Sequence, residues 1–261
     1  MALSVLVNRD LFDRICAFQA GWPLELLNYY RGVYKLSGST LQWLDFAAST
    51  GNIPVLEIAM HSRVFCVTSA ALDQAARHGH LKTVAWLDKA KASCTIWAMN
   101  EAARRGHLEI VRYLHHNRSE GCSTYALHHA LIQQHWEIVN FLQNQRHEGC
   151  SSHTLVQAVQ ACQLQSVEFI FRHGYHGSSG VQAMDLAATL GHFHIVQFLH
   201  IHNAMGCTTQ AIDGGAQHGH VEIVEFLLQH RTEGFTRLGI ERAKTDRISA
   251  LLAANTRLLQ Y

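Results

Sequence analysis

The sequence predicts an all-α fold, in which helix-turn-helix repeats stack into a solenoid. A pattern of small residues, a Gly-His pair and an apolar stripe recurs along the chain at intervals of 27 to 29 residues. A fixed period of this length is typical of units that bury their apolar faces only against neighbouring units. Each unit also contains two segments with the apolar spacing of a helix. The copies begin at Ala47, Ala75, Ala102, Ala130, Ala158, Ala187 and Gly215.

The first 40 residues are expected to cap this array as a degenerate repeat followed by a loop. Phe12, Ile15 and Phe18 have helical spacing, Gly21 suits a turn, and Pro23 suits the start of a second helix. Residues 31–40 form the least regular early stretch and are predicted to be the loop.

Each repeat is expected to begin with a helix that carries a pair of small residues. In the unit that spans residues 94–121, Thr95 can accept a hydrogen bond from the first amides of this helix. Ala98 and Ala102 follow at helical spacing on one apolar face. Gly106 stands where a left-handed residue would end the helix. Equivalent glycines are Gly51, Gly79, Gly191 and Gly219.

The second half of the same unit predicts a second, antiparallel helix. Leu108, Val111 and Leu114 recur at intervals of three residues, as in the apolar stripe of an amphipathic helix. Glu109 lies in the first turn, where a negative charge suits the helix dipole. The return to the next unit is short, and its glycine permits a sharp reversal.

Cysteines occupy one equivalent position in successive repeats, eight residues before the small pair. Equivalent residues in stacked helices lie about 10 Å apart, which is too far for an unstrained disulfide. We therefore expect reduced thiols at Cys94, Cys122, Cys150 and Cys207.

The last segment keeps the helical period after Gly239 but loses the Gly-His pair and gains charged residues. This composition suits a terminal repeat with one polar face. The expected organisation is therefore a capping repeat and loop over residues 1–40, seven repeats over 41–235, and capping helices over 236–261.

The repeat resembles the ankyrin repeat, whose core combines paired alanines, two variable residues, a Gly-His pair and a Val-Leu-Leu helix. AARRGHLEIVRYL, which begins at Ala102, shows this pattern. The family's Thr-Pro-Leu-His opening is replaced here, for example by WAMN from Trp97. The unit is also shorter than the usual length of about 33 residues. The resemblance implies shortened or absent β-hairpin fingers, as in the short-period ankyrin arrays of some microbial eukaryotes.

Composition argues against several classes of protein. The chain has 21 basic and 20 acidic side chains, a formal charge of +1, so it lacks the charge excess that non-specific nucleic-acid binding requires. No run of 18 apolar residues predicts a membrane span. The apolar opening is only seven residues long and has no preceding basic stretch, so no secretory signal is expected. We expect an intracellular protein, cytoplasmic or nuclear.

Twenty histidines raise the alternative of a zinc-binding protein. No CxxC or HExxH motif accompanies them, and neither a GxSxG motif nor a phosphate-binding glycine loop predicts an enzyme. Neutral histidines titrate near pH 6.5, so a pH-sensitive surface is a further alternative. We expect no metal and no cofactor. Five histidines fill the Gly-His position, where the ring can bond local backbone: His80, His107, His135, His192 and His220.

The functional signal lies in columns that vary while the scaffold stays constant. In ankyrin proteins such columns line the concave face, and aromatic and arginine side chains are common binding hot spots. The alternative for Trp97 and Tyr125 is that they pack between adjacent helices. The predicted partner-binding residues are Trp97, Glu101, Arg104, Arg105, Tyr125, His128, His129, His153 and Gln157.

The sequence therefore predicts a monomeric, non-enzymatic scaffold or adaptor that binds a partner protein through the concave face. It does not identify that partner. One irregular segment, HGYHGSSG over residues 173–180, adds a residue and three glycines to the period, which is consistent either with a bend in the array or with sequence drift.

Overall fold

A computed structural model describes residues 40–54, 56–57, 68–202 and 206–260 of the chain. The predicted capping repeat and loop over residues 1–40 lies outside the described residues, except for Thr40. By their contacts the residues divide into two compact units, Met1–Ala126 and Leu127–Tyr261, and each unit is described by itself.

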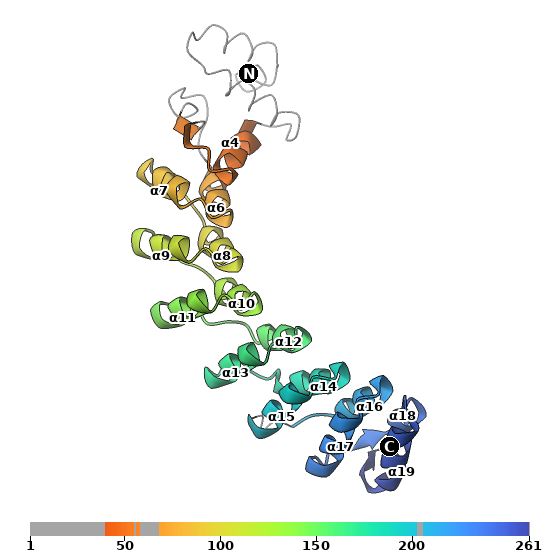
Figure 1. The fold of residues 1–261 in the computed structure, drawn as a ribbon. Helices are drawn as coiled ribbons and strands as arrows, with labels where there is room; N and C mark the ends of the chain where they lie inside the picture. Colours follow the sequence, from red (N-terminus) through yellow and green to blue (C-terminus); the bar gives the residue numbers. More distant parts are fainter. Residues whose placement is uncertain (1–39, 55, 58–67, 203–205, 261) are drawn as a thin grey trace. The chain divides into compact units, whose positions relative to one another are not determined.

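The first unit consists of helix pairs in which the first helix of each repeat packs on the first helix of the next. Helix α4 packs on α6, α6 packs on α8, and the second helices α7 and α9 contact each other alongside (Figure 1). The bounds are α4 Thr40–Ser49, α6 Ser69–Arg77, α7 Leu81–Lys89, α8 Ile96–Arg105 and α9 Leu108–Asn117, and α10, Thr124–Ile132, begins in this unit.

The second unit repeats the same arrangement. The first helices α12, α14, α16 and α18 pack in chain order, and α13, α15, α17 and α19 contact one another in the same way. The bounds are α11 Trp136–Gln145, α12 His153–Gln160, α13 Leu164–Arg172, α14 Gly180–Leu190, α15 Phe193–His202, α16 Thr209–His218, α17 Val221–His230, α18 Arg237–Glu241 and α19 Asp246–Ala254.

Small residues bring the first helices close together. The paired alanines are fully buried in most copies, so no side chain separates the packed backbones. The second helices bury most of the predicted stripe, but not its first position. In α9 the buried residues are Ile110, Val111 and Leu114, whereas Leu108 is only half-buried. Leu108 opens the helix, and its side chain lies at the rim of the stack.

The predicted all-α repeat fold is confirmed. Within the described parts of the chain, the only strands are β1, Phe235–Thr236, and β2, Leu259–Gln260, so the described parts of the return loops contain no β-hairpin finger. The two strands pair in parallel. The bounds of the three predicted segments stay a prediction.

The C-terminal segment closes the last repeat in a way that the sequence did not indicate. Strand β2 follows a short 3₁₀ helix, Thr256–Leu258, and pairs with β1. Phe235 replaces the cysteine of the other junctions and is fully buried. Lys244 takes the place of the missing histidine: its backbone N–H donates to the carbonyl oxygen of Ala216 at 3.0 Å, and its side chain packs beside Gly219.

Candidate functional site

Three periodic sets of polar contacts join neighbouring repeats, and they account for many of the polar residues in the array. The first set involves the Gly-His pair. The ring of His80 bonds to the backbone carbonyl of Ser49 at 2.8 Å, and that of His220 bonds to the carbonyl of Thr189 at 3.1 Å. The sequence predicted a bond to local backbone at the histidine's own helix junction. That prediction is wrong for these rings, which reach the preceding repeat. In each ring Nε2 is the donor in this arrangement.

Glycine is required at this turn for two reasons. Gly191 has a φ of +83°, in the left-handed region, and a Cβ at this position would lie 2.5 Å from the ring of His220. Gly79 shows the same geometry with His107, at 2.8 Å. A side chain would therefore both strain the backbone and displace the histidine of the next repeat.

The second set is an acid-to-hydroxyl contact that we call the inter-repeat latch. Asp73 accepts from the backbone N–H of Thr95 at 3.0 Å and from its hydroxyl at 2.7 Å. The Thr95 hydroxyl in turn accepts from the N–H of Trp97 and caps helix α8. The same two bonds to aspartate recur in Asp185 with Thr208 and Asp213 with Thr236.

Burial raises the pKa of Asp73 and of Asp185, although the bonds from the threonines oppose that shift. Sequence reasoning assigned the capping role of the threonine but missed its aspartate. The signal that could have found it is an Asp or Asn two residues before the small pair in five of the seven copies.

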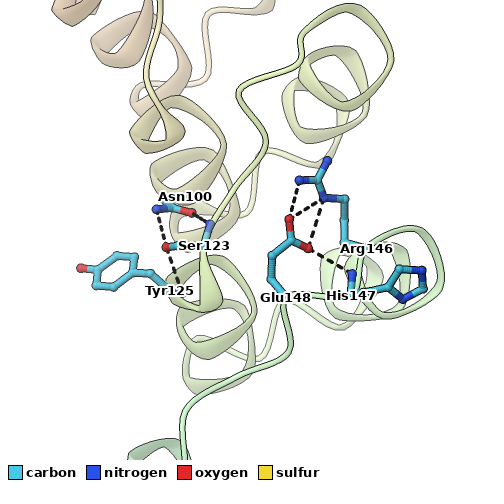
Figure 2. A network of polar contacts seen from close by, with 6 residues as sticks. All are labelled: Asn100, Ser123, Tyr125, Arg146, His147 and Glu148. Carbon is cyan, nitrogen blue, oxygen red and sulfur yellow. Dashed lines mark hydrogen bonds and ion pairs between the residues drawn. The ribbon is translucent and has the colours of Figure 1, made fainter.

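Two latch positions depart from aspartate: Asn100 keeps the contact, and His128 makes a different one. Asn100 donates to the hydroxyl of Ser123 at 3.0 Å and accepts from its backbone N–H at 3.0 Å. Figure 2 shows both bonds, with the Tyr125 ring pointing away from them. In the second unit His128 occupies the latch position, and its Nδ1 lies 2.8 Å from the hydroxyl of Thr154.

His128 is buried. Burial is the largest cause that lowers its pKa to about 4, and the neighbouring His129 and His153 act in the same direction. The structure therefore places this predicted partner-binding residue inside the stack, away from the exposed columns.

The third set lies in the return loops. Arg118 bonds to Asp88 at 3.0 Å and to Glu120 at 2.7 Å. Arg146 and Glu148 pair in the same way in the second unit, where Glu148 also accepts from the backbone N–H of His147 (Figure 2). These pairs fix the loops that would carry hairpin fingers in a longer repeat.

The described cysteines are free thiols. Burial raises the pKa of Cys94 and of Cys150 to about 11 and that of Cys207 to about 12. Because the thiolate is the reactive form, these buried groups lack the character of a nucleophile.

The exposed columns of the first unit contain five of the predicted partner-binding residues. Trp97 is 48% exposed, and its ring meets that of Tyr125 edge-on with centroids 5.3 Å apart. Glu101 accepts from Nε of Arg104 at 3.1 Å and from Nη2 at 2.8 Å. Arg105 is exposed. The bond from Glu101 is the main cause that raises the pKa of Arg104, which stays charged.

The remaining predicted residues lie on the second unit. His153 is exposed and Gln157 is half-buried, and the two side chains meet at 3.1 Å across one helical turn. His129 is half-buried, with its ring edge-on to that of His128 at 4.6 Å between centroids. The first unit therefore carries a group of aromatic and arginine side chains. The second unit carries a group of histidine and glutamine side chains.

Comparison with known proteins finds a matching family model. A family model described as ankyrin repeats, in three copies, matches residues 72–154. Residues 72–154 carry ankyrin repeats. Among solved structures it is similar to the crystal structure of the human ASB11 ankyrin repeat domain, at 15% sequence identity and a TM-score of 0.36, with 81% of this chain and 96% of that chain covered. No curated protein matches the chain.

Ankyrin repeats are in general protein-interaction modules without catalytic activity. Two hollows lie among the described residues. One, of about 370 Å³, lies on second helices between Trp136, Asn140, Gln165, Glu168, Phe169 and Arg172. Another, of about 350 Å³, lies at the return loop of residues 145–148. Neither contains a predicted partner-binding residue.

The histidine-rich composition has a structural explanation. In the described residues, no three His, Cys, Asp or Glu side chains are grouped to hold a metal ion. Several rings bond to the carbonyl four residues earlier, which completes the last turn of their helix: His78, His116, His173, His202, His218 and His230.

No described helix is long and apolar enough to cross a membrane.

Proposed function

We propose that this protein is a scaffold or adaptor that binds a partner protein through the exposed face of its first helices. The face is defined here as Trp97, Glu101, Arg104 and Arg105 of α8, with Tyr125 of α10. The main support is Trp97, a large aromatic side chain that is half exposed where the same helix buries its alanines. Tryptophan, tyrosine and arginine are the residue types that dominate binding hot spots.

The scaffold role requires no chemistry from the protein itself. Burial raises the pKa of the Cys94, Cys150 and Cys207 thiols, and polar side chains at the repeat junctions bond to one another. We propose further that the protein acts inside the cell as a monomer, without metal or cofactor. The reduced cysteines at the repeat junctions are consistent with that compartment.

The variant Trp97→Ala, Tyr125→Ala tests the proposed face. Both changes remove exposed aromatic area and leave the buried small pairs of α8 intact. We expect affinity capture from native extract to lose its specific partners by about tenfold or more, as truncation of a hot-spot residue costs about 2 kcal/mol or more.

The matched control is Ile201→Ala, which removes the most exposed large apolar side chain of the described residues, on the second helix α15. Circular dichroism should show that both variants keep the helical content of the unaltered chain. Capture of the same proteins, in the same amounts, by the double variant and the control would contradict the proposed face.

A further inference from the structure

The first unit gathers basic side chains on the face that the proposed function assigns to a partner. Arg77 ends α6, and Arg104 and Arg105 end α8, so they lie at the same position of two consecutive repeats. Glu101 is the acidic residue among them. Its carboxylate lies 3.5 Å from Nε of Arg77 and accepts from Arg104.

Glu101 lies deeper in the structure than the arginines that it contacts. The side chain of Glu101 is only 15% exposed, whereas that of Arg77 is 38% exposed and that of Arg104 is 28% exposed. One carboxylate is therefore shared between two guanidinium groups that are both partly exposed. Glu101 thus positions two guanidinium groups around a site that carries excess positive charge.

The aromatic residue and this basic group lie on one stripe of α8. Trp97 and Arg104 are seven residues apart, which is two helical turns and brings them to the same side of the helix. The separation along the axis is about 10 Å at 1.5 Å per residue. Ile96, at the start of the same helix, is 39% exposed and enlarges the apolar end.

We propose that the occupant of this face is an acidic linear segment of a partner protein, with an apolar side chain on Trp97 and a carboxylate on the arginines. This inference rests on the proposed function and specifies its partner. An extended peptide advances about 3.3 Å per residue, so about three residues span the distance from the apolar end to the basic end. Carboxylate and guanidinium form strong, bidentate hydrogen bonds.

Selection from a displayed library of random linear peptides tests the chemistry directly. With the full chain as bait, we expect enriched peptides to contain Asp or Glu about three residues from an aromatic or branched apolar residue. For a selected peptide, binding should weaken as salt is added, because the arginines are partly exposed to solvent.

Two variants separate the two ends of the face. Arg104→Gln with Arg105→Glu should abolish the preference for acidic residues and weaken a selected peptide about tenfold or more, since hydrogen bonds to charged groups contribute about 1.5–3 kcal/mol. Trp97→Ala should weaken the same peptide but keep the acidic preference. Ile201→Ala should change neither property.

An absence of enriched peptides, enrichment without an acidic excess, or an acidic excess that survives the arginine changes would each overturn the inference. These results differ from a failure of the proposed function. If the aromatic double variant loses its native partners while no acidic preference emerges, the face binds a partner of other chemistry. If that variant loses nothing, the face itself is wrong.

Discussion

At the scale of single residues, the residue at the latch position decides whether neighbouring repeats are joined by a carboxylate, an amide or an imidazole. Asp73 and Asp185 accept two bonds each, Asn100 both donates and accepts, and His128 replaces them with one contact to Thr154. The equivalent residue in the following repeat is Val156, which has no polar group to offer. The latch is therefore strongest outside the middle of the array.

His128 should make the stability of the protein depend on pH. Its pKa is about 4 in the folded protein, below the ordinary value of 6.5. Between these values the unfolded chain binds a proton that the folded chain does not, so stability is fully present above about pH 6.5 and falls as the pH drops toward 4. The contribution is on the order of 1–3 kcal/mol.

Chemical denaturation at a series of pH values, with His128→Gln as the comparison, measures this contribution. The variant should show a flatter fall in the free energy of unfolding across the window, while His153→Gln, at an exposed histidine nearby, should follow the unaltered chain. Parallel curves for all three proteins would show that His128 is not the group responsible.

At the scale of the helix and its turn, glycine has two separable roles. Gly191 and Gly174 both have φ in the left-handed region, but a Cβ at Gly191 would meet His220 whereas a Cβ at Gly174 would meet nothing within 4 Å. In the turn that follows α12, Cys162 adopts the left-handed conformation with a φ of 55°. A residue other than glycine can therefore occupy this backbone conformation.

We expect Gly174→Ala to cost about 1–2 kcal/mol of unfolding free energy, from the left-handed backbone alone. Gly191→Ala should cost about 1–3 kcal/mol more, because it also crowds a packed ring. Thermal or chemical denaturation of the two variants measures the difference. Equal losses would mean that the histidine ring moves aside without cost.

At the scale of the whole molecule, repeats contact mainly their neighbours, so the stability of each unit is close to a sum of repeat and interface contributions. The C-terminal segment is one such contribution. Strand β2 pairs with β1, and the side chain of Phe235 in β1 is fully buried. Loss of the C-terminal segment should therefore destabilise the adjoining helices first.

Deletion of residues 256–261 tests this local effect by amide hydrogen exchange. We expect faster exchange in α16 and α17 and unchanged exchange in α8 and α9, because local opening follows the contacts that are removed. A uniform rise in exchange along the chain would show that the segment stabilises the whole array rather than its last repeats.

The sequence by itself determined the repeat, its period, its helices and the glycine turns, because a period with two apolar stripes has few packed solutions. It also identified Trp97 and Arg104 as candidate binding residues, in columns that vary while the scaffold stays constant. The tertiary structure alone decided what the polar residues bond. His107 reaches the carbonyl of Arg77, Asp73 latches Thr95, and His128 turns inward. These partners lie 22 to 30 residues apart in sequence, and only the stacking of one repeat on another brings them within hydrogen-bond distance.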